Sequence, residues 1–191
     1  KKITMRAMNG ELAFQDALKE RVALLAECPS TVVEEVLEQR ITLRPGGKTL
    51  VNTMKANGAY TALISGGFTA FSVPVGEILG FDEQHANILQ EENGIFTGQV
   101  IDPILGKNEK VNRLKSLVKD RGLSQKDVLA VGDGANDLGM LEIAGMGVAM
   151  HPKPIVAEKC EIVINHCDLT SLLYLQGYRK EEFVGPKTDI K

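Results

Sequence analysis

The sequence lacks the features that mark several classes of protein. Its three cysteines, Cys28, Cys160 and Cys167, form no CxxC spacing, which argues against a disulfide scaffold or a closed zinc site and favours a reducing cytoplasm. His151 and His166 lie near two of these cysteines, but the spacing fits no zinc pattern. No apolar run approaches the roughly 20 residues of a membrane helix, so no membrane is expected as a partner. There is no internal repeat and no low-complexity segment.

The sequence also lacks a large excess of positive or negative charge. Lysine and arginine number 22 against 25 aspartates and glutamates, the formal net charge is −3, and no basic block occurs. Nucleic acid is therefore not an expected partner. Hydrophobic residues make up 43% of the 191 positions, which is ordinary for a globular protein with a real core.

Alternating strand and helix patterns predict an α/β fold with a doubly wound, Rossmann-like parallel sheet, a small helical cap and a β-hairpin. We expect the cap in residues 1–43 and the α/β core in residues 44–191. Expected helices cover residues 11–27, 32–40, 47–58, 72–80, 110–122, 140–145, 155–160 and 169–175. Expected strands cover residues 60–65, 127–133, 147–150 and 161–165, and the hairpin covers residues 85–100.

The two cap helices carry few apolar residues, which suits a lid better than an independent core. Phe14, Leu18 and Leu25 form one stripe at helical spacing. Thr31 and Glu34 have the spacing of a capping box at the start of the second helix. Further along the chain, Asp168 is expected to cap the final helix.

One strand end presents an acidic loop, Gly132-Asp133-Gly134-Ala135-Asn136-Asp137. Ligands of open α/β sheets bind beyond the carboxyl ends of the strands. Two carboxylates and an amide at that place suit a hard cation such as Mg²⁺, completed by water and a substrate phosphate. The alternative is a polar turn that caps the next helix. A dinucleotide fingerprint fits poorly, because Asp137 stands where the third glycine would be.

A second strand end carries Ser65-Gly66-Gly67, whose hydroxyl and open backbone N–H groups suit a phosphoryl oxygen. An ordinary glycine turn is the alternative. The next helix is expected to start near Ser72 with Pro74 in its first turn, so its dipole is not part of this interpretation.

Lys110 and Arg21 are the two cations of interest. Lys110 breaks a local rule, because it lies in the first turn of a helix, where a positive charge opposes the macrodipole. The alternative for Lys110 is a stem that lies over apolar surface with its charged head in water, and Lys107 is the competing choice from the same turn. Arg21 projects from the apolar stripe of the first cap helix, where it either snorkels or clamps a carboxylate. Taken with the two strand ends, these residues suggest Mg²⁺-dependent phosphoryl transfer. The missing part is a strand-end aspartate to attack phosphorus.

The segments SGGF (65–68), Lys110 and GDGAND (132–137) resemble motifs of the haloacid dehalogenase-like phosphatase superfamily. The cap segments RAMNGELAF (6–14) and KERVALL (19–25) are similar to those of its phosphoserine phosphatases. The resemblance implies a core with the fold of that superfamily. It also implies a cytoplasmic, Mg²⁺-dependent hydrolase. Its substrate would be the small phosphomonoester O-phospho-L-serine, which it would hydrolyse to L-serine and phosphate in the last step of serine biosynthesis.

The resemblance also implies a role for individual residues. It implies that Asp133 binds Mg²⁺ directly and that Asp137 supports the metal site. Ser65, Gly66 and Lys110 would hold the phosphoryl group, with Asn136 close to it. The remaining three, which would line the substrate pocket, are Met8, Phe14 and Arg21, with Arg21 pairing with the serine carboxylate; packing within the cap is the alternative for Met8 and Phe14.

The sequence departs from the family in one respect. The DxDx[ST] motif, which supplies the aspartyl nucleophile and the general acid, is absent, as is the glutamate that recognises the substrate amino group. We expect both to lie upstream of Lys1. The alternatives are a phosphatase for another small phosphomonoester and a catalytically silent phosphate-binding remnant.

Overall fold

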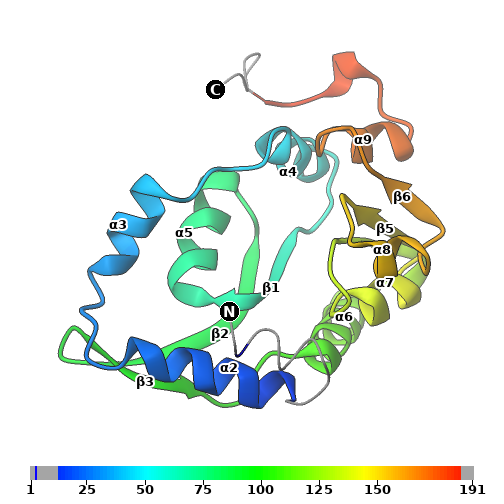
Figure 1. Ribbon diagram of the computed structural model, residues 1–191. Helices are drawn as coiled ribbons and strands as arrows, with labels where there is room; N and C mark the ends of the chain where they lie inside the picture. The colour runs from blue at the N-terminus through cyan, green and yellow to red at the C-terminus, as the bar shows by residue number, and fades with distance from the viewer. Residues whose placement is uncertain (1–2, 4–12, 186–191) are drawn as a thin grey trace. The chain divides into compact units, whose positions relative to one another are not determined.

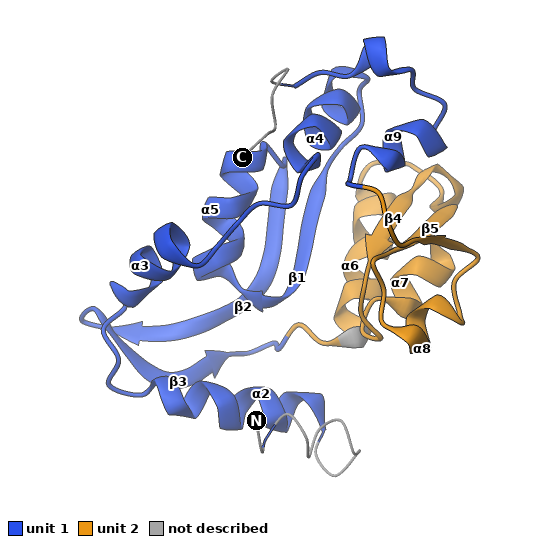
Figure 2. Ribbon diagram, turned by 45° about the horizontal axis from the view of Figure 1, so that its top comes forward, with its two compact units in different colours: residues 1–104, 168–191 blue, residues 105–167 orange. Residues whose placement is uncertain are grey.

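The computed structural model describes residue 3 and residues 13–185 (Figure 1). The chain forms two compact units (Figure 2): unit 1 comprises residues 1–104 and 168–191, and unit 2 comprises residues 105–167. Both contain helices and β-strands, which confirms the α/β class. Both sides of the expected cap boundary, residues 43 and 44, fall in unit 1, and that boundary stays a prediction.

Unit 1 holds a three-stranded sheet in the order β1-β2-β3. Its elements are α2 (Phe14–Val22), the 3-10 helix η1 (Ala23–Leu25), α3 (Val32–Gln39), α4 (Gly47–Ala56), β1 (Ala62–Phe68), α5 (Thr69–Leu79), β2 (Glu83–Glu92), β3 (Ile95–Ile101), α9 (Ser171–Leu175) and η3 (Lys180–Glu182). The expected hairpin is present as β2 and β3.

Strand β2 divides its length between two partners. Residues 83–87 pair in parallel with β1, and residues 88–92 pair antiparallel with β3. The sheet of unit 1 is therefore mixed, and the hairpin is one end of it. Strand β2 begins at Glu83, two residues before the expected hairpin. The additional residues belong to the part of β2 that pairs with β1.

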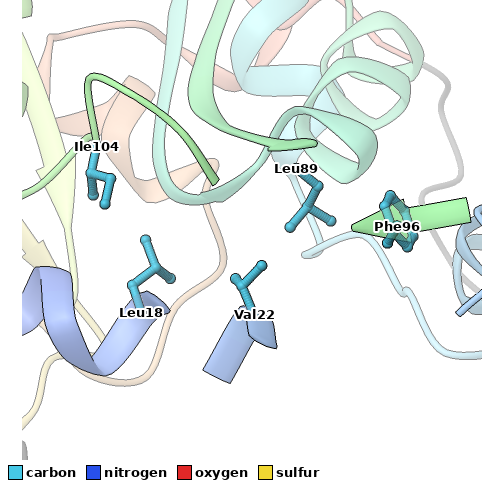
Figure 3. Close-up of a cluster of buried hydrophobic side chains, with 5 residues drawn as sticks. All are labelled: Leu18, Val22, Leu89, Phe96 and Ile104. Atoms are coloured by element: carbon cyan, nitrogen blue, oxygen red, sulfur yellow. The ribbon is translucent and has the colours of Figure 1, made fainter. Parts of the chain in front are cut away.

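The apolar face of α2 packs against the hairpin. Leu18 and Val22 point toward Leu89, Phe96 and Ile104 (Figure 3), and all five are nearly inaccessible to solvent. Burying side chains of this size contributes about 1.5–3 kcal/mol each. Leu18 and the half-buried Leu25 thus confirm the predicted stripe, whereas Phe14, at 46% exposure, lies outside this core.

Two local predictions, one for α3 and one for α5, are wrong. Thr31 makes no capping hydrogen bond, because backbone carbonyls of the preceding turn already accept the first N–H groups of α3. Helix α5 begins at Thr69 and not near Ser72, so Pro74 lies inside the helix. Packing of α5 on β1 and β2 outweighs the hydrogen bond that the proline removes.

The last described segment belongs to unit 1 through long-range contacts. The Leu169 N–H donates to the Pro45 carbonyl, and the Val184 N–H donates to Thr53 Oγ1 at 2.8 Å. The predicted cap at Asp168 is wrong: the N-cap of α9 is Thr170, which makes no side-chain capping hydrogen bond. Asp168 Oδ1 instead accepts the Thr170 N–H at 2.9 Å in the turn before the helix.

Unit 2 holds a parallel three-stranded sheet in the order β4-β5-β6. Its elements are α6 (Lys107–Asp120), η2 (Gln125–Asp127), β4 (Leu129–Gly132), α7 (Leu138–Ile143), β5 (Met146–Met150), α8 (Pro154–Ala157) and β6 (Ile162–Ile164). Val148, Ala149 and Val156 are fully buried at its centre. Strand–helix alternation thus produces the predicted βαβ pattern here.

The cysteines and His151 take ordinary structural positions. Cys28, Cys160 and Cys167 are free thiols. The ring nitrogens of His151 lie 2.9 and 2.8 Å from the carbonyl oxygens of Asn165 and Cys167. None of the helices in the described part of the chain has the length and apolar character for a membrane crossing.

Candidate functional site

The acidic loop of unit 2 connects β4 to α7. The Asp137 N–H donates to the Gly134 carbonyl at 2.9 Å, and the Asp137 carbonyl accepts the N–H groups of Met140 and Leu141. The loop is thus a tight turn that runs directly into the helix. Asp133 lies at the carboxyl end of the strand, where the sequence placed it.

Asp137 is the residue around which this loop is organised. Its Oδ1 lies 2.6 Å from Lys110 Nζ, and both side chains are buried, at 6% and 7% exposure. Its Oδ2 accepts the N–H groups of Asp133 and Gly134 at 3.2 and 3.0 Å. One carboxylate therefore joins helix α6 to the backbone of the loop by charge-assisted hydrogen bonds.

The two glycines of the loop are required by side chains that lie against them. A Cβ at Gly132 would come within 2.5 Å of the Asp137 Cβ, and a Cβ at Gly134 would come within 2.4 Å of Asn136 Oδ1. Asn136 and Asp137 thus fold back over the glycine backbone. Residues with larger side chains would displace both.

Asp133 is left facing solvent. Its backbone carbonyl accepts the Lys153 N–H at 3.2 Å, while its side chain is exposed and Asn136 beside it is half-buried. Within residue 3 and residues 13–185, no three His, Cys, Asp or Glu side chains gather into a metal-binding group. Asp133 suits Mg²⁺ as one carboxylate ligand among waters and phosphate oxygens, whereas both carboxylate oxygens of Asp137 already accept hydrogen bonds.

The second candidate site lies within β1 of unit 1. The prediction that Ser65-Gly66-Gly67 follows the end of a strand is wrong, because pairing with β2 resumes at Phe68 and extends β1 through all three residues. Ser65 Oγ accepts the Gly67 N–H at 3.0 Å. Because α5 starts at Thr69, only Phe68 separates its first turn from the Ser65–Gly67 segment, and the first N–H groups of a helix, which lack intrahelical partners, add a positive end there. This contribution was absent from the sequence interpretation, which started the helix too late.

The predicted substrate residues lie on α2 or before it. Arg21 is exposed, and Phe14 on the same helix is 46% exposed. Met8 lies outside the described residues. The exposed positions of Arg21 and Phe14 leave both able to meet a ligand.

Sequence reasoning missed the direct partnership of Lys110 and Asp137. The available signal was Lys110 itself, a cation in a first helical turn that shares a face with Leu114, because a buried lysine needs a carboxylate. The structure brings together four of the predicted residues, Lys110, Asp133, Asn136 and Asp137, in unit 2, while Ser65 and Gly66 belong to unit 1. The side chain of Lys107 lies outside the described part of the chain.

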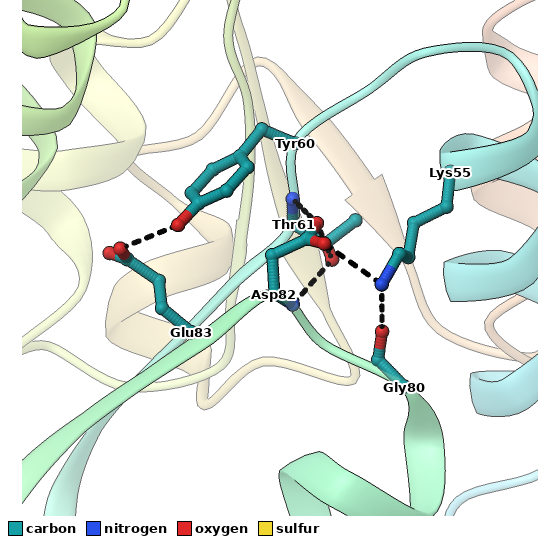
Figure 4. Close-up of polar contacts among 6 residues, drawn as sticks. All are labelled: Lys55, Tyr60, Thr61, Gly80, Asp82 and Glu83. Carbon is teal, nitrogen blue, oxygen red and sulfur yellow. Dashed lines mark hydrogen bonds and ion pairs between the residues drawn. The ribbon is translucent and has the colours of Figure 1, made fainter.

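A second lysine–aspartate pair lies in unit 1, at the other end of β1 and β2 (Figure 4). Lys55 Nζ lies 2.8 Å from Asp82 Oδ1, and Asp82 Oδ2 accepts hydrogen bonds from the backbone and hydroxyl of Thr61. Burial acts to raise the pKa of Asp82, but the hydrogen bonds from Lys55 and Thr61 and the charge of Lys55 outweigh it, so the pKa lies below its usual value.

A family model described as haloacid dehalogenase-like hydrolase matches residues 2–142. The chain belongs to the haloacid dehalogenase-like hydrolase family. This membership confirms the family resemblance that the SGGF and GDGAND segments indicated.

Among the haloacid dehalogenase-like hydrolases, the chain is similar to proteins named phosphoserine phosphatase. The phosphoserine phosphatase of Streptomyces coelicolor is 40% identical over 186 residues, which cover 97% of this chain and 45% of the relative. That of Methanocaldococcus jannaschii is 39% identical over 173 residues, 91% of this chain and 82% of the relative. The chain spans about half the length of several curated relatives that it matches.

Solved structures show the same likeness. The phospho-aspartyl intermediate analogue of a phosphoserine phosphatase superposes with a TM-score of 0.82 at 38% identity, covering 91% of this chain and 83% of that one. The fold is therefore the α/β fold of the haloacid dehalogenase-like hydrolases.

Proposed function

We propose that this chain forms part of a Mg²⁺-dependent phosphatase that releases phosphate from O-phospho-L-serine, the last step of serine biosynthesis in the cytoplasm. The observation that carries the proposal is the extent of the similarity: relatives named phosphoserine phosphatase match 97% and 91% of the chain. The acidic loop braced by a buried lysine supports the same reaction class, because phosphoryl transfer depends on positioning and charge neutralisation.

The proposed metal site is the loop of unit 2. Asp133 supplies the direct carboxylate ligand, and Asp137 fixes the loop backbone from which that ligand projects. When bound, Mg²⁺ supplies a Lewis acid that polarises phosphoryl oxygens. Asn136 of the same loop, whose side chain lies against Gly134, is the proposed amide contact of a phosphoryl oxygen.

Ser65 and Gly66 of unit 1 are proposed to bind phosphoryl oxygens. Lys110 of unit 2 is also a proposed phosphate-binding residue. The Ser65 hydroxyl accepts the Gly67 N–H through its oxygen, which leaves its own hydrogen to donate to a phosphoryl oxygen. Lys110 carries three N–H donors, and Asp137 accepts at one of its own oxygens. The Lys110 ammonium therefore has further N–H groups that can donate to a phosphate. When no phosphate is bound, Asp137 still balances its charge.

The substrate carboxylate is the proposed partner of Arg21. Its exposed guanidinium on α2 presents a planar fork that matches a carboxylate in bidentate geometry. Phe14 and Met8 would contact the remainder of the substrate. A non-reacting carboxylate held in this way supplies binding energy remote from the phosphorus.

The proposal includes a nucleophile and a general acid that residues 1–191 do not contain, because the sequence has no DxDx[ST] motif. The experiment therefore measures phosphate release from phosphoserine by the complete protein that carries this chain. We expect turnover with Mg²⁺ and its loss in excess chelator. Equal rates in both conditions would contradict the metal assignment.

A second arm of the same experiment tests the substrate. Arg21→Ala should lower kcat/KM for phosphoserine at least tenfold, as expected for a lost charged contact, and should change that for phosphoethanolamine little. Lys19→Ala removes another exposed cation from α2 and is the matched control. Equal losses on both esters would contradict the pairing of Arg21 with the substrate carboxylate. Phosphate binding without turnover of any ester would indicate a silent phosphate-binding protein.

A further inference from the structure

Strand β1 bulges at the residues proposed to bind phosphate. Its pairing with β2 is regular up to Ile64, which lies opposite His85, and resumes at Phe68, which lies opposite Asn87. Between these pairs, three residues of β1 face the single residue 86 of β2. Such a bulge removes backbone groups from the regular ladder, so their orientation has to be fixed by other contacts.

Asn87 makes one of those contacts. Its Nδ2 donates to the Gly66 carbonyl oxygen at 3.0 Å, and only 1% of the residue is exposed. Asparagine is disfavoured in strands, and a buried amide is costly unless it is hydrogen-bonded. An apolar side chain would suit this position better if packing were all that it provided.

The same peptide group is held from its other side by Ser65. The Gly66 carbonyl and the Gly67 N–H belong to one rigid, planar peptide unit. Asn87 Nδ2 binds the oxygen of this unit, and Ser65 Oγ accepts the hydrogen of its N–H at 3.0 Å. A rotation of the peptide would break both hydrogen bonds together.

We infer that Asn87 is a positioning residue for phosphate: it holds the Gly66–Gly67 peptide in the orientation that aims the Ser65 hydroxyl at a phosphoryl oxygen. This inference rests on the proposed function of Ser65 and Gly66. Asn87 itself does not touch the phosphate, and its effect passes through the peptide to Ser65.

The test compares two asparagines of unit 1. Asn87→Leu keeps the branching of the side chain and removes the donor without adding charge. Asn57→Leu is the matched control, because Asn57 Nδ2 also donates to a backbone carbonyl, that of Thr53 at 2.8 Å, at the end of α4. The dissociation constant of inorganic phosphate is measured by calorimetry on the complete protein with Mg²⁺ present.

We expect Asn87→Leu to weaken phosphate binding by about tenfold, the usual effect of one lost hydrogen bond, and Asn57→Leu to leave it unchanged. In a Ser65→Ala background the Asn87 substitution should change binding by less than about threefold, because both residues act on one peptide. A purely structural role would lower the melting temperature and leave the dissociation constant of the folded protein unchanged.

The outcomes separate this inference from the proposed function. If Ser65→Ala weakens phosphate binding and Asn87→Leu does not, the inference is wrong and the function stands. If the unmodified protein does not bind phosphate, both are wrong. If Asn87→Leu does not fold, the side-chain amide of Asn87 in the unmodified protein is followed by NMR: phosphate should shift it and not that of Asn57, and an unshifted Asn87 signal overturns the inference.

Discussion

The two lysine–aspartate pairs of this chain have similar geometry and different surroundings. Lys110 and Asp137 in unit 2 lie 2.6 Å apart with side chains 7% and 6% exposed, whereas Lys55 and Asp82 in unit 1 lie 2.8 Å apart with side chains 38% and 24% exposed. Burial decides how much stability is lost when one partner of each pair is removed. Neither charge of the buried pair can recover hydration if its partner is lost, while water replaces either partner of the exposed pair.

The pairs also differ in what they hold. Asp137 ties a helix to a loop that presents an exposed carboxylate, and Asp82 ties the start of β2 to Thr61 before β1. The buried pair thus fixes the backbone of a candidate site in unit 2. The exposed pair joins the starts of β1 and β2 in unit 1. Proximity of opposite charges alone would not have distinguished them.

The largest expected effect comes from breaking the buried pair. Lys110→Met or Asp137→Asn should each lower the free energy of unfolding by about 3–5 kcal/mol, because each leaves one uncompensated buried group. The double variant should lose less than the sum of the two. Urea unfolding followed by circular dichroism measures all three. Losses below about 1 kcal/mol for the single variants would mean that the two pairs are energetically alike.

A smaller effect is expected from crowding the buried pair. Gly132→Ala places a Cβ 2.5 Å from the Asp137 Cβ and should cost about 1–3 kcal/mol by displacing that side chain. Gly47→Ala is the control, because its nearest neighbour would be an ordinary contact at 3.4 Å, and we expect a change within about 0.5 kcal/mol. Thermal unfolding of both variants provides the measurement. Similar melting temperatures would show that the loop yields to the extra carbon.

The smallest effect is expected at the exposed pair. Asp82→Asn should lower the free energy of unfolding by about 1 kcal/mol at pH 7 and low salt. Because the folded-state pKa of Asp82 is lowered, its contribution is complete above the unfolded-state pKa of about 3.9 and is lost as the pH falls through the folded-state value.

The measurement for this variant is urea unfolding of both proteins at pH 7 and at steps from pH 5 to pH 3. The difference between them should shrink toward the acid end and should also shrink in 1 M salt, which screens exposed charges. A difference that grows on acidification would contradict the assignment of a lowered pKa to Asp82.

Much of the fold could be predicted because its signals are local. Helical and strand periodicity located the elements of unit 2, and glycines with acids at a strand end located the loop from Gly132 to Asp137. The family resemblance rested on the same short segments. These patterns depend on residues that are neighbours in the sequence.

What could not be predicted depends on residues that are far apart. Lys110 and Asp137 are 27 positions apart, and no local pattern pairs them. Strand β2 serves two partners only because of the register that the sheet adopts. The start of α5 at Thr69 follows from packing that overrides the preference of Pro74 for a first turn.

The hydrogen bond from Val184 to Thr53 spans 131 positions, so it can form only after the segment that carries Val184 has been synthesised. Residues 105–167 form a unit of consecutive residues, so all of its contacts are available once that stretch has left the ribosome. Unit 1 must wait for residues 168–185 before the buried Thr53 hydroxyl meets its partner. During synthesis the later unit can therefore fold to completion first, while the earlier one remains exposed to chaperones and proteases.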